Sequence, residues 1–254
     1  MNIVIIGTGN AASVLGRKFK AAGHKILQVV GRNSAAASEL AYALDTVSGN
    51  YLSAINRNAE VYIIAVADGA IPAIIHDLKL HGKVVAHTAA SVSMEILKNV
   101  SEHYGVFYPL QSLRKEADPV TNIPIFVDGS DEATIRSLQA LAHSISGDAV
   151  ALRPGNDERA RLHVAAVFVN NFTNYLYVLA ESYCKKEGID FKLLLPLIEE
   201  TALRVKTNSP RTVQTGPAMR HDQATIDKHL QLLEQYPELK KVYAFLSDSI
   251  EKMK

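Results

Sequence analysis

Residues 2–12 read Asn2-Ile3-Val4-Ile5-Ile6-Gly7-Thr8-Gly9-Asn10-Ala11-Ala12. The apolar run 2–6 is typical of a strand buried on both faces, and residues 11–22 favour a helix that Gly23 ends. In such a strand–turn–helix the first glycine permits a tight turn, the second admits a pyrophosphate and a small third residue allows close packing. We therefore predict a dinucleotide site at Gly7, Thr8, Gly9, Asn10 and Ala11, whose helix N-terminus offers free N–H groups to phosphates. The alternative is a purely structural turn.

The residues after the second expected strand, 25–30, indicate which dinucleotide binds. They read Gly31-Arg32-Asn33-Ser34 and contain no acidic side chain that would accept from a ribose 2′-hydroxyl. The Arg32 guanidinium instead suits the 2′-phosphate of NADP(H), and Asn33 and Ser34 can donate to the same group. The sequence therefore favours NADP(H) over NAD(H). Arg32 as an ordinary solvated surface arginine is the alternative.

Strand-like and helix-like segments alternate as far as Leu152. Further strands are expected at 61–66, 83–87, 106–108, 123–127 and 149–152, with helices at 34–44, 69–78, 93–100 and 131–144. This order predicts an α/β fold with a doubly wound, mostly parallel Rossmann sheet. Residues at the carboxyl ends of its strands should line the cofactor crevice, and here these are Ala65, Val66, Asp68 and Thr88. Asp68 could equally be a helix N-cap, and His87 a buried histidine with its hydrogen bonds made.

Beyond a turn-rich stretch at 153–156 the pattern is helical. Helices are expected at about 157–187, 191–207, 222–235 and 238–253. We therefore predict a Rossmann domain over 1–153 and an all-α C-terminal domain over 154–254, which provides substrate contacts and dimer contacts.

The composition excludes several classes of function. The 254 residues carry 27 Lys plus Arg and 26 Asp plus Glu, so no global field would hold nucleic acid or an acidic membrane. The single cysteine, Cys184, permits neither an intrachain disulfide nor a cysteine-based metal cage, and the nine histidines lack zinc spacing. No apolar run approaches the ~18–20 residues of a membrane span. A cytoplasmic protein without a metal site is expected.

Several motifs together resemble one family. They are His87-Thr88, Tyr108-Pro109-Leu110-Gln111-Ser112, Leu162-His163, Asn170-Asn171, Leu195-Pro196-Leu197, Thr215-Gly216-Pro217, Arg220, Asp222 and His229-Leu230. This set resembles Rossmann-like proteins with the C-terminal domain of unknown function 2520, relatives of pyrroline-5-carboxylate reductase, ketopantoate reductase and deazaflavin-dependent NADP reductases. The resemblance covers nearly the whole chain and implies an NADP-dependent oxidoreductase, but it supplies no substrate. The chain departs from the pattern at Ala89-Ala90, where relatives often have Ser-Gly, and at His221, where they often have Gly.

Polar residues on the expected helix 157–187 are the candidate catalytic groups. Asn170 lies seven helical steps after His163, which is about 700° and so almost two full turns, and Asn174 extends the same stripe. Asn171 lies about 80° round from His163. His163 would move the proton that accompanies hydride transfer, and Asn170 or Asn171 would orient the substrate. Hydrogen bonding between helices is the alternative.

Two arginines in the long polar stretch between later helices, Arg211 and Arg220, could hold a substrate carboxylate. An Arg220–Asp222 pair with Asp222 as an N-cap would be the structural alternative. We expect an NADP(H)-dependent oxidoreductase that transfers hydride to or from a small carbonyl or imine bound between the two domains, and that forms a homodimer through the helical domain. The alternative is an NADP-binding sensor or scaffold without turnover.

Overall fold

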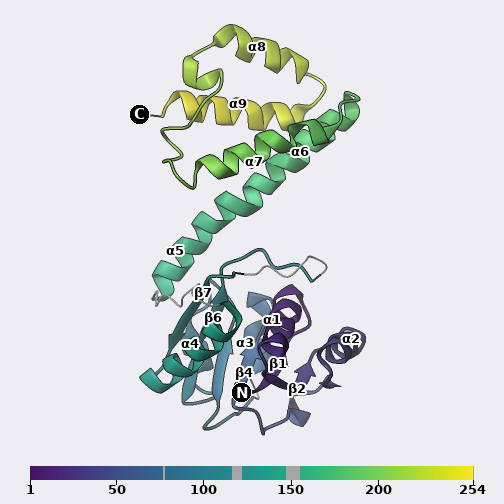
Figure 1. Cartoon of the computed structure of the whole chain (residues 1–254), viewed down its shortest axis with the longest axis vertical. Helices are drawn as coiled ribbons and strands as arrows, with labels where there is room; N and C mark the ends of the chain where they lie inside the picture. Colours follow the sequence, from purple (N-terminus) through teal and green to yellow (C-terminus); the bar gives the residue numbers. More distant parts are fainter. Residues whose placement is uncertain (77, 116–121, 147–154, 254) are drawn as a thin grey trace. The chain divides into compact units, whose positions relative to one another are not determined.

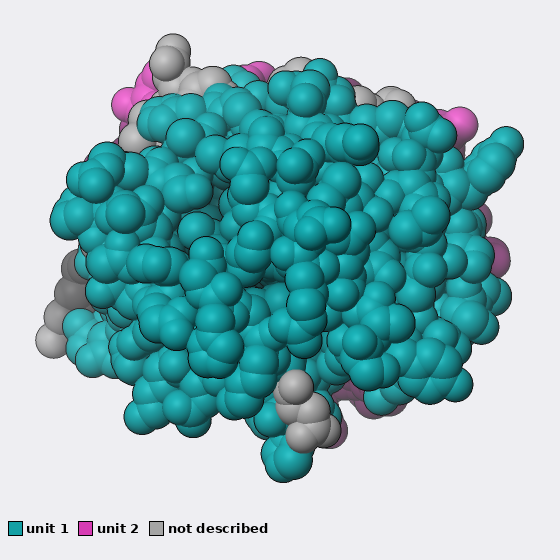
Figure 2. Space-filling view, turned by 90° about the horizontal axis from the view of Figure 1, so that it is seen from below, with its two compact units in different colours: residues 1–171 teal, residues 172–254 magenta. Residues whose placement is uncertain are grey.

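The computed structural model describes residues 1–76, 78–115, 122–146 and 155–253. It divides into two compact units, Met1–Asn171 and Phe172–Lys254, which we call unit 1 and unit 2 (Figure 1, Figure 2). The boundary predicted at 153/154 falls among residues outside the described ranges and stays a prediction.

Unit 1 is built on a seven-stranded sheet with the order β3-β2-β1-β4-β5-β6-β7. The strands are β1 (Asn2–Ile6), β2 (Lys25–Val30), β3 (Val47–Gly49), β4 (Val61–Ile64), β5 (Val84–His87), β6 (His103–Pro109) and β7 (Ile125–Gly129). Neighbouring strands pair in parallel except β6 and β7, which pair antiparallel. The strand β1 lies between β2 and β4. The strands that follow β1 in sequence are added first on the β2 side and then on the β4 side, so the strand order reverses at β1. The predicted doubly wound, mostly parallel sheet is confirmed.

Four helices of unit 1 cover the sheet on both faces, namely α1 (Asn10–Ala21), α2 (Ser34–Leu44), α3 (Ile71–Ile75) and α4 (Glu132–Ser146). The helix α5 (Asn156–Ala166) also belongs to unit 1, and Arg159 is its one buried residue. Leu15 of α1, Leu40 of α2 and Leu138 of α4 belong to one buried cluster, which includes Ile3 and Ile5 of β1. Ile71 of α3 belongs to a second cluster with Val4 and Ile6. Because alternate residues of β1 enter different clusters, the strand is buried on both faces, as its apolar run predicts.

Several local expectations were wrong. The strand β3 was not expected, because only three mostly exposed residues form it at the sheet edge. The helix expected at 69–78 is a 3₁₀ turn from Asp68 to Ala70 followed by the short α3, and Asp68 makes no side-chain cap. The helix expected at 93–100 is a 3₁₀ turn over Met94–Leu97, although Ser93 does cap it. The strand expected at 149–152 lies outside the described residues.

A long helical segment follows α5. A π-helical turn, Val167–Phe172, leads into α6 (Thr173–Lys186), and unit 2 continues with α7 (Leu195–Arg204), α8 (Gln223–Leu232) and α9 (Pro237–Glu251). The strands all lie in unit 1, so the described part of unit 2 is helical, as predicted. Cys184 is buried on α6. Among the described residues, no helix combines the length and apolar character needed to cross a membrane.

Candidate functional site

The turn between β1 and α1 can only be made by glycine at position 7. Gly7 has φ +131°, and a Cβ there would lie 2.0 Å from the carbonyl oxygen of Ala65. The Gly7 N–H donates to the Val30 carbonyl at 2.8 Å. The turn is therefore held against the ends of both β2 and β4, which brings three strand ends together.

Gly9 has a different environment, because a Cβ there would meet nothing within 4 Å. It is the N-cap of α1, no side chain caps this end, and no acidic residue lies in the first turn. The first N–H groups of α1 therefore have no partner within the helix or from a side-chain cap, and the space beside Gly9 is open, which suits a phosphate group near Thr8, Asn10 and Ala11. Ala12, at the third position of the motif, is fully buried, as close helix–strand packing requires.

The segment after β2 is exposed and lacks a carboxylate between Gly31 and Ser34. Arg32, Asn33 and Ser34 are all exposed. Asn33 is the N-cap of α2, and its Oδ1 accepts from the Ala36 N–H at 3.0 Å. Its side-chain amide hydrogens therefore stay available as donors, as does the Arg32 guanidinium.

Four further predicted cofactor residues lie at the same edge of the sheet. Ala65 and Val66 continue β4, with the Ala65 N–H donating to the Ile6 carbonyl at 2.8 Å. Thr88 continues β5, and its N–H donates to the Ile64 carbonyl at 3.1 Å. Asp68 is exposed on the loop that follows Val66. In a parallel sheet this edge, at the carboxyl ends of the central strands, is where a nucleotide binds.

His87, the last residue of β5, is fully buried. Its Nδ1 accepts from the Ala89 N–H at 3.2 Å, whereas its Nε2 has no hydrogen-bond partner in the described structure. Burial, and next the positive charge of Arg159, lower the pKa of His87 to about 4. The imidazole is therefore neutral at physiological pH. His87 is buried, as the alternative interpretation of the sequence expects, but only one of its two ring nitrogens has a hydrogen-bond partner in the described structure.

The sequence analysis missed Arg159, which anchors α5 to the loop after β5. Its side chain is fully buried, Nε donates to the Ala90 carbonyl at 2.8 Å, and Nη2 donates to the Val92 carbonyl at 2.6 Å. Nη2 also donates to Asn156 Oδ1 at 2.9 Å, whereas Nη1 has no partner among the described residues. Within the described part, all three acceptors are neutral. An arginine at this position reads as an ordinary helix-surface residue, so no sequence signal marked it.

The anchored helix brings His163 to Tyr108 at the end of β6. The Tyr108 hydroxyl and His163 Nδ1 are 3.0 Å apart, and the two rings meet edge to face. Tyr108 is 8% exposed and stacks on Phe126, while His163 is half-buried. The sequence analysis quoted Tyr108 as a family mark but did not assign it a role. Its position at the end of a strand was the available signal.

The stripe expected from His163 to Asn170 and Asn174 does not follow regular helical geometry. The segment Val167–Phe172 is π-helical, so hydrogen bonds span one more residue and each residue turns through less than 100°. The angular steps calculated for an α-helix are therefore wrong beyond Ala166. Asn170 is half-buried and Asn171 is exposed in this wide turn. Turns of this kind are frequent at functional sites, and the catalytic assignment of both asparagines stays a prediction.

Arg211 and Arg220 are both exposed on unit 2. Asp222 caps α8 by accepting from the Thr225 N–H at 3.1 Å and from the Thr225 hydroxyl at 2.7 Å, which lowers the pKa of the Asp222 carboxyl. The cap of the structural alternative is therefore present. The role of both arginines in binding a carboxylate stays a prediction.

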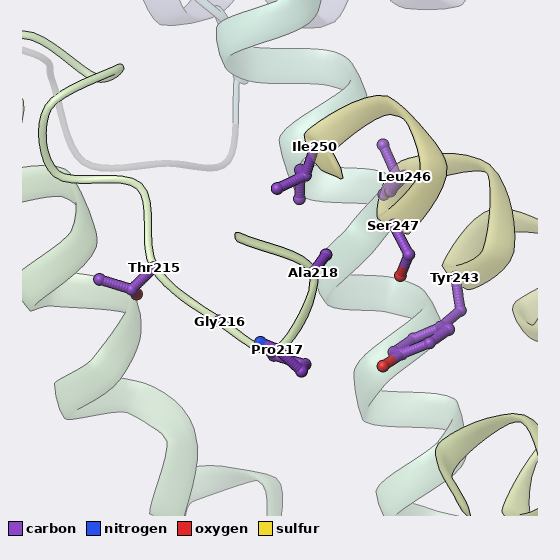
Figure 3. Close-up of a pocket in the computed structure, with 8 residues that line it drawn as sticks. All are labelled: Thr215, Gly216, Pro217, Ala218, Tyr243, Leu246, Ser247 and Ile250. Atoms are coloured by element: carbon purple, nitrogen blue, oxygen red, sulfur yellow. The ribbon is translucent and has the colours of Figure 1, made fainter. Parts of the chain in front are cut away.

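A small pocket of about 180 Å³ lies in unit 2 and is shown in Figure 3. Its lining is mostly apolar and consists of Thr215, Gly216, Pro217, Ala218, Tyr243, Leu246, Ser247 and Ile250. The Tyr243 hydroxyl lies 2.8 Å from His229 Nδ1. Across the described residues, no group of three or more His, Cys, Asp or Glu side chains could hold a metal ion.

Comparison with known proteins adds two family matches. Residues 2–91 match the family described as "NADP oxidoreductase coenzyme F420-dependent", and residues 123–250 match a domain of unknown function, DUF2520. No curated protein sequence matches the chain.

Solved structures that are similar over nearly the full length include the following three. A "putative NADP oxidoreductase" from Bacteroides fragilis is 35% identical, with 99% of this chain and 98% of that chain covered and a TM-score of 0.90. A reductive aminase from Aspergillus terreus, in complex with NADPH and ethyl-5-oxohexanoate, is 15% identical, with 99% and 92% covered and a TM-score of 0.71. A 1-pyrroline-5-carboxylate reductase from Streptococcus pyogenes is 16% identical, with 100% and 99% covered and a TM-score of 0.64. The last two likenesses show the fold alone.

Proposed function

Because the chain belongs to the NADP oxidoreductase family that carries the DUF2520 domain, we propose that it is an NADP(H)-dependent oxidoreductase that transfers hydride to or from a small carbonyl or imine. The observation that carries the proposal is the pair of glycines at the end of β1. At position 7 the positive φ and the nearby Ala65 carbonyl require a glycine, whereas Gly9 leaves open space at an uncapped helix N-terminus. A purely structural turn explains the first glycine but not the second.

The residues of unit 1 fit an NADP dinucleotide. The N-terminus of α1, with Gly7, Thr8, Gly9, Asn10 and Ala11, would hold the diphosphate. Arg32, Asn33 and Ser34 would hold the 2′-phosphate through charge-assisted hydrogen bonds, because no carboxylate stands in that segment to repel it.

The loops after β4 and β5 would flank the nicotinamide end of the cofactor. Their residues are Ala65, Val66, Asp68 and Thr88. The cofactor supplies the hydride, and the chain's own residues must orient the substrate and move the accompanying proton. His163 takes part in the proton transfer, because its imidazole carries one nitrogen that can donate a proton and one that can accept it. Asn170 and Asn171 in the π-helical turn would orient the reacting group, and Arg211 and Arg220 would bind a substrate carboxylate. That the substrate binds between the two predicted domains remains a prediction.

The direct test is turnover of a panel of small carbonyls and imines with NADPH, combined with His163→Gln and Asn171→Ala. We expect both substitutions to lower kcat by at least about tenfold while the Kd for NADPH stays within twofold. The contrary result is a pair of variants that change only the oligomeric state, with no substrate found for the wild type. That result would favour the sensor or scaffold without turnover.

We further propose a homodimer formed through unit 2, in the cytoplasm. Among the described residues of unit 2, four hydrophobic residues are buried, whereas 14 large ones are exposed. The most exposed are Leu193 (73%), Phe245 (70%) and Leu197 (64%). So much apolar surface on so small a core favours burial against a second copy. Light scattering should show a dimer that Leu197→Lys weakens, and a monomeric wild type would contradict the proposal.

A further inference from the structure

We propose that Tyr108 donates the proton to the substrate, with His163 behind it, and that the site selects a neutral carbonyl rather than a protonated imine. This inference rests on the proposed function and names the substrate class of the same site. It depends on three side chains of unit 1, Tyr108, Arg159 and His163, which α5 and the end of β6 bring together.

The position of Tyr108 places its hydroxyl at the cofactor edge of the sheet. In the register of β5 and β6, His87 lies opposite Val106, so Tyr108 lies beside the residues that follow Thr88. Tyr108 packs in one cluster with Ala90, Val106 and Phe126. Its hydroxyl is therefore held close to the loop predicted to flank the nicotinamide, and its ring is fixed by neighbours on both sides.

The hydrogen bond to His163 decides what the tyrosine can do. With a proton on Nδ1, His163 donates to the Tyr108 oxygen across 3.0 Å, and the phenolic hydrogen is free to be donated elsewhere. Burial raises the pKa of Tyr108, and the exposed Asp68 carboxylate adds to this, so the phenol is protonated at neutral pH. The positive charge of Arg159 opposes both effects and stabilises negative charge that develops on the tyrosine oxygen.

The charge around this pair is set by a buried cation. The Arg159 guanidinium bonds only to neutral oxygens in the described structure, and its Nη1 is left without a partner. Arginine keeps its charge even when burial lowers its pKa, as it does here. His87 adds no charge because its imidazole is neutral.

Two carboxylates lie near enough to influence the site. Asp128, half-buried at the end of β7, acts on Arg159, and the exposed Asp68 acts on Tyr108. Neither forms an ion pair within 4.0 Å with Arg159 or His163 in the described structure. The group next to Tyr108 and His163 is therefore positively charged.

The reaction is balanced with the reduced nicotinamide dinucleotide as the two-electron reductant. A hydride forms the new C–H bond at the carbonyl carbon, the C=O π bond breaks, and the oxygen takes the proton of the Tyr108 hydroxyl. His163 Nδ1 returns a proton to the tyrosine oxygen, and solvent reprotonates the half-buried imidazole. The products are an alcohol and the oxidised dinucleotide.

This electrostatic environment favours one substrate class. A carbonyl develops negative charge on oxygen during hydride addition, and a buried cation with an O–H donor stabilises that charge. An imine accepts hydride as its protonated iminium, whose positive charge a neighbouring guanidinium repels. The chain lacks a carboxylate in contact with Tyr108 and His163, among described residues, that would stabilise such a cation.

The test compares cyclopentanone with 1-pyrroline, which share a five-membered ring, alongside simple aldehydes, ketones and 2-oxo acids, all with NADPH. We expect carbonyl kcat/KM to exceed that for 1-pyrroline by at least about tenfold. Tyr108→Phe should lower carbonyl kcat by about 10²–10⁴-fold with unchanged NADPH binding, because the ring and its packing remain. Tyr104→Phe on the same strand, which loses only an exposed hydrogen bond to Glu95, is the matched control and should keep full activity.

Further variants separate charge from structure. His163→Gln should lower carbonyl kcat while KM and the Kd for NADPH stay unchanged, which a merely structural change would not do. Arg159→Lys keeps the positive charge and should keep the preference for carbonyls. Arg159→Met removes the charge and, under conditions in which the variant is folded, should lower the ratio of kcat/KM for carbonyls to kcat/KM for 1-pyrroline. Preference for 1-pyrroline, a Tyr108→Phe enzyme within threefold of wild type, or NADPH binding without turnover of any carbonyl would each overturn the inference alone. Absence of NADPH binding would instead overturn the proposed function, so the two failures are distinguishable.

Discussion

Substituting Gly9 by Ala should separate cofactor binding from folding. Gly9 has φ −80° and ψ −172°, a conformation open to alanine, and the added Cβ would meet no atom within 4 Å. The cost to folding is the poorer N-cap preference of alanine, below about 1 kcal/mol. Gly7→Ala differs because its Cβ would lie 2.0 Å from a backbone oxygen at φ +131°. Backbone strain and overpacking together make its cost roughly 2–6 kcal/mol.

The assay pairs urea denaturation with calorimetric titration of NADPH for both variants. Gly9→Ala should unfold within about 1 kcal/mol of wild type but bind NADPH at least tenfold more weakly, or about 1.4 kcal/mol, because the methyl group occupies space needed by the diphosphate. Gly7→Ala should lower the stability of the fold, and its NADPH binding should weaken because the fold is destabilised. A Gly9→Ala protein that binds NADPH as tightly as wild type would refute the placement of the diphosphate at this helix end.

Two further predictions concern Asn33 and His87. Asn33→Asp should keep the thermal stability of the protein, because aspartate caps a helix as well as asparagine, yet weaken NADPH about tenfold by charge repulsion while sparing NADH; equal weakening of both cofactors would contradict this. Folding lowers the pKa of His87 from 6.5 to about 4. The free energy of unfolding should therefore keep its full value above pH 6.5 and decrease as the pH falls towards 4. The loss should be about 3 kcal/mol, from about 2.5 pH units at 1.36 kcal/mol each. Urea denaturation at several pH values across this range should show that the free energy of unfolding depends less on pH in His87→Gln than in the wild type. An equal pH dependence in both proteins would show that another group is responsible.

The regular part of the fold could be predicted because local pattern and burial agree there. The strand Lys25–Val30 and the helix Ser34–Leu44 have the expected bounds, and Asn33 is the cap. The edge strand β3 was missed, because three mostly exposed residues carry little hydrophobic pattern. The alternative role of Asp68 as a helix N-cap is wrong, because Asp68 lies inside a 3₁₀ turn and makes no side-chain cap, and Pro72 at the start of α3 follows that turn. Such short turns depend on tertiary packing more than on local preference.

The candidate site was predictable in part. The glycine turn follows from a motif with a local mechanism, so its conformation could be predicted directly, whereas the role of Arg32 stays a prediction. The Tyr108–His163 bond joins residues 55 positions apart, and it depends on the anchoring of α5 by Arg159. No periodicity encodes that contact. The π-helical turn changed the angular relation of Asn170 to His163 for the same reason, because helical steps were assumed to be uniform.

The central claim is that this chain binds NADP(H) at the glycine turn and the Arg32 segment. Calorimetric titration of the full chain with NADPH and with NADH at fixed salt, repeated on Arg32→Ala, tests it most directly. The account predicts at least tenfold tighter binding of NADPH, and loss of that preference in Arg32→Ala as the contact with the 2′-phosphate is removed. If the wild type binds neither dinucleotide, the Gly7–Ala12 turn is only structural, and the proposed oxidoreductase activity is refuted.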